Sequence, residues 1–555
     1  MPEYSVLVGG QAGDGIRQFG SLIARLLSSL GYRIYFWDDY PSLIRGGHNF
    51  SIIRASDRPV GAYTETVDVL VALNQTVVEK HASALKPRGL VIIDTDAVKA
   101  DGIKAAVLGL PLAGIVKQAG GKPIMRNTAG LGVVARALGI PWDAVRALIQ
   151  AEVAKQTDLN LKIAQTAFDQ AGSPRLEVAP LGQPALPLIG GNEAIALGAV
   201  RAGLTLYVAY PMTPSSNLLH FLAQNDQALG VVAYHPENEI AAVVTAIGGA
   251  YAGARTMVGT SGGGFALMVE GVSLAAGSEC PVVFVVGQRP GPSTGLPTYT
   301  CQSDLFFVLN AGHGEFVRFV VAPGDPDQAF LLAGLAMNTA WKYQIPAFII
   351  SDKNLSEGTF SLAVRGDEVR REEPAAWDGK GRYRRYARTQ EGVTPLAFPG
   401  MPGAVVKANS YEHDEYGITT EDADETTRMQ DKRLIKGKYL AADVDGMEAV
   451  KVYGDPGAKA ALLTWGSTKG ACVEVAEELG LKVIQPLVME PFPAEQLRRA
   501  LEGVSRLIAV ENNATGCLAR LAGCHGVAVG RRILKYDGRP FAVEGLRRRV
   551  EEALR

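Results

Sequence analysis

Tyr210-Pro211-Met212-Thr213-Pro214-Ser215-Ser216 is the stretch from which the fold of the central part of the chain can be read. The apolar residues 204–209 before it predict a buried strand, Pro211 ends that strand, and the hydroxyl residues that follow are of the types that begin helices. A strand, loop and helix in this order put hydroxyls and free backbone N–H groups at the carboxyl edge of a sheet, where ligands of open α/β sheets bind. The loop is a candidate site, although an ordinary connecting loop with a proline stop and a serine cap also explains it.

The alternation of strands and helices continues on both sides of this loop. Asn192 is predicted to cap the helix before it, and Gly203 to end that helix. A mostly parallel sheet with helices on both faces is expected, so the fold class is α/β. The further predicted strands are residues 231–234, 256–260, 282–286, 317–321 and 347–351.

Four motifs in this region occur together and in a fixed order. That order resembles the α subunit of 2-oxoacid:ferredoxin oxidoreductases, above all the 2-oxoglutarate type, in which a γ-like domain is fused ahead of the α part. The similarity extends over nearly the whole chain. The motifs are Tyr210–Ser216, then Glu239-Ile240-Ala241-Ala242, then Thr260-Ser261-Gly262-Gly263-Gly264, then Gln288 to Thr298 with Arg289.

The resemblance implies thiamine diphosphate as cofactor, with Gly262 and Gly263 in its binding site. This cofactor acts as an ylid and needs a carboxyl group that hydrogen-bonds to its aminopyrimidine ring. Glu239, at the start of an apolar helix, can be buried and protonated there and donate that bond, which makes it the predicted catalytic residue. A glutamate stabilised by the helix dipole is the alternative, and Glu237 fits that description as well. The motif selects Glu239.

The resemblance also implies which residues bind the substrate. A 2-oxoacid brings a carboxylate into a dry site, and guanidinium receives a carboxylate through two parallel hydrogen bonds. Arg289 is predicted to pair with that carboxylate and Thr213 to bond the carboxylate or ketone, with Tyr210 and Ser215 also in the substrate site. A loop arginine that forms a salt bridge to a partner subunit is the alternative for Arg289.

Two absences from the sequence predict a partner. Thiamine enzymes hold the diphosphate with Gly-Asp-Gly and an asparagine about thirty residues on, and Gly13-Asp14-Gly15 lacks that asparagine, because Asn49 is followed by Phe50. The five cysteines form no C-x-x-C pair. The diphosphate, Mg²⁺ and iron–sulfur cluster are therefore expected on a β subunit, in an (αβ)2 heterotetramer that reduces ferredoxin, and this chain is expected to bind no metal.

Residues 1–172 resemble the family's γ domain, which is Rossmann-like and is implied to lie near the path of coenzyme A. A strand at Tyr4–Val8, a glycine-rich turn and a second strand, Tyr32–Trp37, that ends in two aspartates also suggest a dinucleotide fold, but Gln18 replaces the third fingerprint glycine. The coenzyme A path is assigned to Gly13, Gly15, Arg45 and Thr294. A solvent-exposed loop arginine is the alternative role for Arg45.

The remaining boundaries follow composition. Residues 173–189 are a Pro- and Gly-rich linker, 190–365 the pyrimidine-binding domain, 366–455 a polar connector that packs against its neighbours, and 456–555 a domain like the C-terminal one of transketolases. Tyr383 to Tyr386 interleaves basic residues with tyrosines that can stack on bases, and His413-Asp414-Glu415 can hold a metal, but a structural role is preferred for both. In Gly466 to Gly470 a tight connection is preferred to a phosphate cradle.

Bulk composition sets the remaining limits. The chain has 555 residues, 47% of them hydrophobic and 20% charged, with a net charge of −2, so neither nucleic acid nor a membrane is an expected partner. Without an apparent signal peptide the expected location is the cytoplasm. The expected reaction converts a 2-oxoacid and coenzyme A to acyl-coenzyme A, carbon dioxide and reduced ferredoxin, or the reverse. Pyruvate, branched-chain or broad-range 2-oxoacids, and a non-catalytic assembly subunit, remain alternatives.

Overall fold

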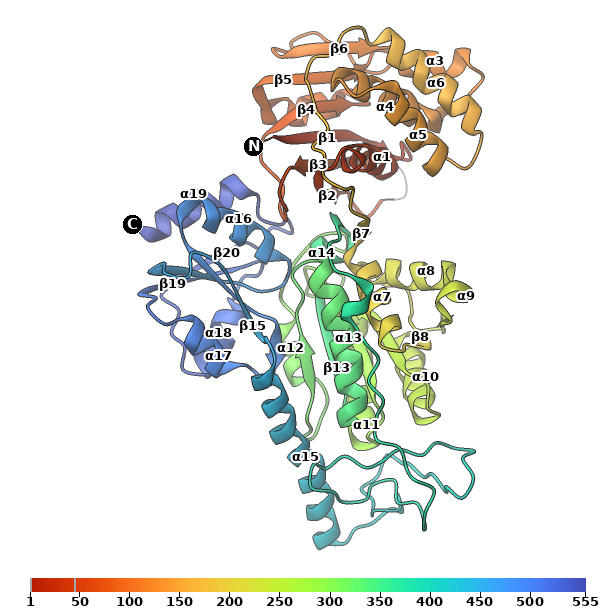
Figure 1. Ribbon diagram of the computed structural model, residues 1–555, viewed down its shortest axis with the longest axis vertical. Coiled ribbons are helices and arrows are strands. Elements are labelled where there is room, and N and C mark those ends of the chain that lie inside the picture. The colour runs from red at the N-terminus through yellow and green to blue at the C-terminus, as the bar shows by residue number, and fades with distance from the viewer. Residues whose placement is uncertain (1, 44–45) are drawn as a thin grey trace. The chain divides into compact units, whose positions relative to one another are not determined.

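The computed structural model describes residues 2–43 and 46–555, and the chain divides into two compact units (Figure 1). Both are discontinuous in sequence. The first consists of Met1–Ile189, Gly358–Ala363 and Phe541–Arg548, and the second of Gly190–Glu357, Val364–Pro540 and Arg549–Arg555. Because each unit contains its own sheets and buried apolar core, each is described separately.

The first unit is built on a mixed sheet in the order β6-β5-β4-β1-β3-β2-β14-β7. Strands β1, β4, β5 and β6 run parallel, whereas β3 is antiparallel to both β1 and β2. The strands are β1 (Glu3–Ala12), β2 (Arg33–Asp39), β3 (Gly46–Ser56), β4 (Val67–Ala72), β5 (Leu85–Asp94), β6 (Ala106–Leu110), β7 (Leu188–Gly190) and β14 (Thr359–Ser361).

Helices complete the core of this unit because their apolar stripes pack on the sheet. Phe19 of α1, Leu131 of α4 and Ile163 of α6 are fully buried in one cluster with Val6 and Val8 of β1. The helices are α1 (Ile16–Ser29), α2 (Gln75–His81), α3 (Leu112–Gln118), α4 (Arg126–Ala137), α5 (Trp142–Glu152) and α6 (Thr157–Gln170).

The start of the chain differs from the sequence prediction. Strand β1 continues to Ala12, four residues beyond the predicted strand, and the turn begins only at Gly13, whose φ is 101°. Asp38 and Asp39 lie within β2, and β3 separates that strand from β1. A dinucleotide fold needs its acidic residue at the end of the strand next to the glycine turn, so the topology argues against that alternative.

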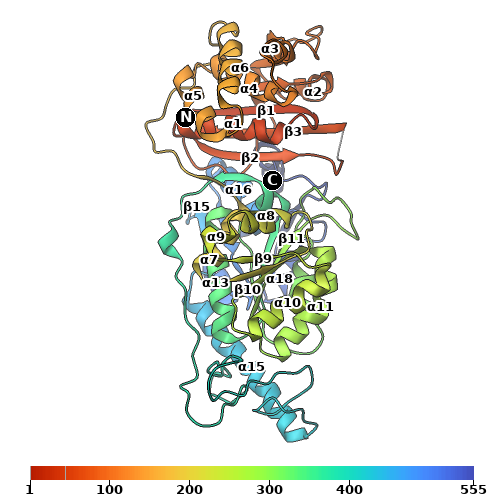
Figure 2. The same cartoon turned by 90° about the vertical axis from the view of Figure 1, so that its right-hand side faces the viewer.

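The second unit contains a mostly parallel sheet in the order β18-β12-β13-β11-β10-β8-β9, with only β18 antiparallel. In Figure 2, α10 and α11 lie on one side of this sheet and α7 and α13 on the other, as the α/β prediction requires. The strands are β8 (Leu206–Val208), β9 (Val232–Tyr234), β10 (Thr256–Ser261), β11 (Val282–Gln288), β12 (Phe319–Val321), β13 (Ala347–Asp352) and β18 (Val488–Glu490). The helices are α7 (Gly191–Arg201), α8 (Ser216–Gln224), α9 (Asp226–Leu229), α10 (Glu239–Tyr251), α11 (Gly262–Gly277), α12 (Leu305–Asn310), α13 (Pro326–Tyr343) and α14 (Lys353–Glu357).

A second sheet of this unit has the order β15-β17-β16-β19-β20 and is parallel except for β15. Strand β15 belongs to this sheet although it precedes residue 456, where the sequence places the start of the last domain. The elements are β15 (Val450–Gly454), β16 (Ala460–Leu463), β17 (Lys482–Pro486), β19 (Arg506–Glu511), β20 (Arg531–Leu534), α16 (Lys469–Leu479), α17 (Ala494–Ala500), α18 (Cys517–Cys524) and α19 (Val543–Leu554).

The polar region predicted as a connector ends in a long helix, α15 (Ala423–Gly446), which the sequence analysis missed. Lys432 and Lys436 of α15 are buried, and both pair with the carboxylate of Glu279, which is buried too; the Lys432 Nζ to Glu279 Oε1 distance is 2.7 Å. Arg385, also buried, donates to the Glu279 carbonyl oxygen. The segment therefore packs against its neighbours through buried charge.

Four further expectations can be compared with this architecture. Tyr383 and Tyr386 are buried beside Arg385, so this cluster offers no surface on which bases can stack. Within the described residues, no group of three or more His, Cys, Asp or Glu side chains is placed to hold a metal ion, and His413 instead packs on the Tyr386 ring. No helix among them combines the length and apolar character needed to cross a bilayer. Residues 172–187, all described, contain neither helix nor strand.

Candidate functional site

Two of the predicted substrate residues meet at the carboxyl edge of the mostly parallel sheet. Strand β8 leads into the loop with Thr213, and β11 leads directly into Arg289. Nη1 of Arg289 donates a hydrogen bond of 2.9 Å to the carbonyl oxygen of Thr213. Although β10 lies between the two strands in the sheet, the loop after β8 crosses it, since a Cβ on Gly287 of β11 would lie 2.6 Å from Oγ of Ser215.

The loop that carries Thr213 is held by buried side chains from outside it. Asn192, within α7, donates from Nδ2 to the carbonyl oxygen of Pro214 at 2.8 Å. Ser215 is almost fully buried and donates to the carbonyl oxygen of Thr260 at 2.6 Å. The predicted cap at Asn192 is wrong, because Gly190 precedes α7, whereas Ser215 stands at the start of α8 as a hydroxyl residue was expected to, although its side chain makes no cap hydrogen bond. Tyr210, at the start of the loop, is exposed with its ring edge toward His235.

Glu239 is a buried carboxyl group at the first position of α10. Asn238 begins the helix, its Oδ1 accepting from the Ala241 N–H at 2.9 Å, and this cap directs the next side chain inward. Glu239 is 4% exposed, whereas Glu237 is exposed. Oε1 of Glu239 has no hydrogen-bond partner among the described residues. A buried oxygen without a partner is costly, so this carboxyl is set up to bond a bound group.

The three glycines at the start of α11 make room for acidic side chains. A Cβ atom on Gly264 would lie 2.6 Å from Oε1 of Glu239, so only glycine allows the carboxyl to approach this helix. A Cβ on Gly262 would lie 2.6 Å from Oδ2 of Asp304, while one on Gly263 would meet nothing within 4 Å. The helix N-terminus is therefore flanked by two carboxyl groups with an open position between them, and its free N–H groups favour a bound anion or polar group there.

Asp304 is a site residue that the sequence analysis missed. Its backbone N–H donates to Oε1 of Gln288 at 2.9 Å, which holds it beside the end of β11. Burial raises the pKa of Asp304 to about 6, against the lowering effects of the Ser303 hydroxyl and the Arg289 charge. Burial also lowers the pKa of Arg289, and Asp304 opposes that change. No motif or spacing marks Asp304, which follows Arg289 by fifteen residues in an irregular loop.

The loop between Arg289 and Asp304 is exposed at its tip, where Thr294 lies. Its far end is anchored by Gln302, which donates to the carbonyl oxygen of Trp465 at 2.9 Å and accepts from Thr468 Oγ1. In the neighbouring Gly466–Thr468 turn, Ser467 Oγ donates to Asp352 at 2.8 Å. These polar groups bond to one another, which agrees with the reading of Gly466 to Gly470 as a tight connection.

In the first unit, Gly13 and Gly15 line a cavity of about 280 Å³ with Arg17, Asp38 and Asp39. Arg17 lies 3.4 Å from Asp38. Asp14 pairs with Arg126 at 2.9 Å, so the Gly-Asp-Gly sequence carries a structural ion pair. Arg45, assigned to the coenzyme A path, lies outside the described residues.

Comparison with known proteins shows the family to which this chain belongs. Residues 197–432 match the family model described as pyruvate flavodoxin/ferredoxin oxidoreductase, thiamine diphosphate-binding, and residues 5–170 match pyruvate ferredoxin/flavodoxin oxidoreductase. The α subunit of 2-oxoacid:ferredoxin oxidoreductase 2 from Aeropyrum pernix is 31% identical over 100% of this chain and 98% of its own length. The chain belongs to the 2-oxoacid:ferredoxin oxidoreductase family. It is an α subunit.

Other relatives of this α subunit extend the likeness to its full length. The KorA subunit of 2-oxoglutarate oxidoreductase from Mycobacterium tuberculosis is 27% identical over 98% of the chain and 90% of its own length. The structure of 2-oxoglutarate:ferredoxin oxidoreductase from Magnetococcus marinus, with 2-oxoglutarate, coenzyme A and succinyl-CoA bound, covers 100% of both chains at 28% identity and a TM-score of 0.91. The resemblance, the α/β fold class and the assignment as an oxidoreductase are thereby confirmed.

The site of this oxidoreductase subunit also fits the cofactor that its family model names. An aminopyrimidine ring offers nitrogen atoms to a carboxyl group, and Glu239 presents a buried Oε1 without a partner among the described residues. Gly263 leaves open space at the start of α11 beside it. Thiamine diphosphate supplies carbanion chemistry when bound, and Glu239 and the glycines at the start of α11 are the groups of this chain that would receive its ring.

Proposed function

We propose that this chain is the α subunit of a 2-oxoglutarate:ferredoxin oxidoreductase. The reaction joins 2-oxoglutarate and coenzyme A to succinyl-coenzyme A, releases carbon dioxide and passes two electrons to ferredoxin, or runs in reverse as a carboxylation in a reductive carbon-fixing cycle. The full-length likeness to an enzyme whose structure holds 2-oxoglutarate, coenzyme A and succinyl-CoA supports this substrate. The observation that carries the proposal is the placement of Glu239, Thr213 and Arg289 after β9, β8 and β11, at the carboxyl edge of one sheet, with Arg289 bonded to Thr213.

In this proposal Glu239 holds the aminopyrimidine ring of thiamine diphosphate, with Gly262 and Gly263 in the wall of the cofactor site. Ionised Glu239 would only accept hydrogen bonds, whereas the protonated group donates one, so the proposed role needs a proton on the carboxyl. The carboxyl is buried beside Gly264, away from solvent. The neighbouring Glu237 is exposed and has no comparable surroundings.

Arg289 is proposed to bind the substrate carboxylate. Its guanidinium carries five N–H donors, of which one is bonded to the Thr213 carbonyl, and this bond fixes the direction of the planar group. The Thr213 hydroxyl is proposed to bond the carboxylate or ketone oxygen. Tyr210 is assigned to the mouth of the site. Ser215 is proposed to support substrate binding indirectly, by anchoring the Thr213 loop, because its hydroxyl is bonded to the carbonyl oxygen of Thr260.

A β subunit is proposed to complete the site and to carry Mg²⁺, the diphosphate site and the iron–sulfur cluster that passes electrons to ferredoxin, in an (αβ)2 heterotetramer in the cytoplasm. An exposed apolar face beside the site supports a partner there: Ile240 and Val244 lie one turn apart on α10, and Leu267 lies on the adjacent α11. Both helices begin at the site. The apolar face continues on β9, with Val232 and Tyr234 exposed.

The path of coenzyme A is proposed to involve Gly13, Gly15, Arg45 and Thr294. Open space at Gly13, where a Cβ would meet nothing within 4 Å, and the exposure of Thr294 support access by a long substrate. Asp38 and Asp39 line the same cavity as Gly13, and their charge disfavours a phosphate close to them. The neutral pantetheine arm is therefore the part of coenzyme A proposed to pass here.

The experiment is an assay of viologen reduction by the native complex, with 2-oxoglutarate, pyruvate, branched-chain and aryl 2-oxoacids in turn. We expect the highest kcat/KM for 2-oxoglutarate. Glu239→Gln should abolish decarboxylation without loss of assembly, because it removes a proton donor and no volume, whereas the matched variant Glu237→Gln should retain activity. Preference for another oxoacid would refute the substrate assignment alone. Activity of the Glu239→Gln complex within a few-fold of wild type would refute the cofactor role.

A further inference from the structure

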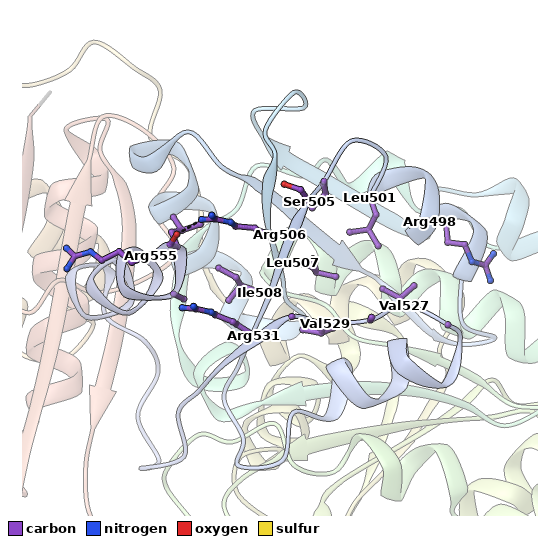
Figure 3. Close-up of a pocket in the computed structure, with 16 residues that line it drawn as sticks. Arg498, Leu501, Ser505, Arg506, Leu507, Ile508, Val527, Val529, Arg531 and Arg555 are labelled. Atoms are coloured by element: carbon purple, nitrogen blue, oxygen red, sulfur yellow. Dashed lines mark hydrogen bonds between the residues drawn. The ribbon is translucent and has the colours of Figure 1, made fainter.

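The sheet β15-β17-β16-β19-β20 has a cavity of about 680 Å³ that the proposed reaction does not use (Figure 3). Its walls come from the segment between α17 and β19, from the loop Gly526–Gly530 before β20, and from the end of α19 with Arg555. Arg506 and Arg531 are the first residues of β19 and β20. The cavity therefore opens at the amino ends of these strands, within the second unit.

The charge in this cavity is of one sign. Arg498, Arg506, Arg531 and Arg555 line it, and none of its sixteen lining residues has a carboxylate side chain. Figure 3 shows Arg506 and Arg531 extending in the same direction, with Ile508 between them. Guanidinium groups without a nearby carboxylate in a concave wall concentrate positive potential and attract anions.

Among the residues that the structure describes, Arg506 and Arg531 bond to backbone carbonyl oxygens and form no ion pair with a carboxylate side chain. Arg506 donates to the carbonyl oxygen of Leu554, and Arg531 donates to that of Glu552 at 3.2 Å. Each guanidinium has five N–H donors, so both retain donors for a ligand while the carbonyl bonds fix their planes. Arg498 pairs with Glu495 one helical turn away, so it contributes less to the positive potential of the cavity. Arg506 and Arg531 are therefore the two ligand-binding cations.

The rest of the lining is aliphatic. Leu501, Val504, Val527 and Val529 line the cavity together with Leu507 and Ile508. A Cβ on Gly526 would meet nothing within 4 Å, so the second loop leaves open space. A single phosphate is far smaller than this cavity, whereas ligands that combine an apolar body with an anionic group have the size that such pockets hold.

The cavity lies at the opposite end of β19 from the catalytic loops. At the carboxyl end of β19, Asn512 donates its backbone N–H to Oε1 of Gln302, the anchor of the Arg289 loop. The six residues of β19 span roughly 20 Å at about 3.3 Å per residue. A ligand here cannot touch the reacting atoms, so the site is separate from that of the oxoacid.

We propose that this cavity binds a nucleoside diphosphate group, with the phosphates held by Arg506 and Arg531 and the flat base between the aliphatic walls. Guanidinium forks match phosphate oxygens through paired hydrogen bonds. The apolar walls would add affinity for the nucleoside that inorganic phosphate lacks. Two sources share this chemistry: a free nucleotide such as ADP, and the adenosine phosphate end of coenzyme A bound at a second place.

Isothermal titration of the native complex with ADP, coenzyme A and inorganic pyrophosphate tests the proposal. We expect saturable binding of ADP or coenzyme A at least about tenfold tighter than pyrophosphate. The double variant Arg506→Gln, Arg531→Gln should weaken that binding at least about tenfold, since each lost charge-assisted bond alone is worth about that factor. Arg532→Gln is the matched control, because Arg532 follows Arg531 on the same strand but does not line the cavity.

A second variant distinguishes loss of nucleotide binding from loss of folding. Arg506 and Arg531 also bond the end of α19, whereas Ala528 is an exposed lining residue without such contacts, and Ala528→Glu places a carboxylate among the arginines. It should weaken nucleotide binding by a similar factor at unchanged Tm. A higher affinity for ADP than for coenzyme A identifies a free nucleotide as the ligand, and the reverse order identifies coenzyme A. The proposal is wrong if pyrophosphate binds as tightly as both, if neither binds, or if their binding survives both variants.

Discussion

Arg289 and Glu239 lie in motifs fifty residues apart, and the structure brings both to the same edge of one sheet. Neither side chain stands alone there: Arg289 is bonded to the Thr213 carbonyl and lies within electrostatic range of Asp304, and Glu239 fits against Gly264. The effect of a substitution at either position depends on these neighbours as much as on the residue itself.

Arg289→Lys tests the proposed carboxylate contact. Lysine keeps the charge but cannot form two parallel hydrogen bonds, so we expect the KM for the oxoacid to rise at least about tenfold with kcat less affected. Thr213→Val should have a similar effect, with the subunits still assembled. Steady-state kinetics on the complex give both values, and size-exclusion chromatography monitors assembly. An unchanged KM together with dissociating subunits would assign the arginine to the interface.

Asp304 should make oxoacid binding depend on pH. Its pKa is raised to about 6, so the carboxyl is neutral below that pH and ionised above it. Once ionised, it attracts the Arg289 guanidinium and repels the substrate carboxylate, so the KM should rise as the pH increases from 5 to 8. Asp304→Asn should remove this rise and lower the KM at pH 8. The same pH profile in the variant and the wild type would show that another group titrates.

The sequence predicted the residues that act through a motif and missed those that act through a tertiary contact. Glu239, Thr213 and Arg289 could be selected because their local sequences are distinctive, although their roles remain predictions. Asp304 and the contact of Asn192 with Pro214 could not, because each depends on a partner far away in the chain. A cap was predicted at Asn192 from local preference alone, but its side chain donates to the carbonyl oxygen of Pro214 in another segment, just as the Ser215 hydroxyl donates to that of Thr260.

Among the elements, the parallel strands were predictable and α15 was not. Buried parallel strands are continuous apolar runs, which stand out in the sequence. Helix α15 has a polar sequence, and the lysines on its inward face look like surface residues in the sequence. Only the structure shows that they pair with the buried Glu279. Glu279 itself has a φ of 52°, which is uncommon for a residue other than glycine and which no local pattern reveals.

Glu279→Gln should destabilise the second unit strongly. Burial alone would raise the pKa of Glu279, but the charges of Lys432, Lys436 and Arg385 outweigh it and hold the pKa well below its usual range. Removing the anion leaves buried cations unpaired, which costs about 3 to 5 kcal/mol. Denaturant unfolding at pH 7 should show this loss, and Glu270→Gln, at an exposed glutamate of α11, is the control.

The destabilisation caused by Glu279→Gln should depend on pH in a defined direction. A carboxyl group with a lowered pKa in the folded state contributes stability above its unfolded pKa and loses it as the pH falls through the folded value. Wild-type stability should therefore decrease in acid below about pH 4.5, and the gap between wild type and Glu279→Gln should narrow there. A gap independent of pH would mean that packing, and not charge, is lost in the variant.

At the scale of the whole molecule, the isolated chain should be colourless and inactive. Its described cysteines are all free thiols, with Cys280, Cys301, Cys472 and Cys517 buried and no metal-binding group among the described residues. A visible spectrum of the purified chain should lack the broad iron–sulfur band, and addition of the β subunit should restore both colour and viologen reduction. A chain that shows the band by itself would contradict the assignment of the cluster to the partner.

The discontinuity of the first unit has a consequence for the order in which the protein is made. Strand β14 pairs with β2 through Thr359 and Phe360, and the Val543 N–H donates to the carbonyl oxygen of Tyr63. The ribosome synthesises residues 1–189 long before these segments exist, so the nascent unit exposes the unpaired edge of β2, the kind of edge at which strands of different molecules associate. Completion of this unit waits for translation of residue 541 and beyond, which makes slow synthesis or premature termination a hazard for its solubility.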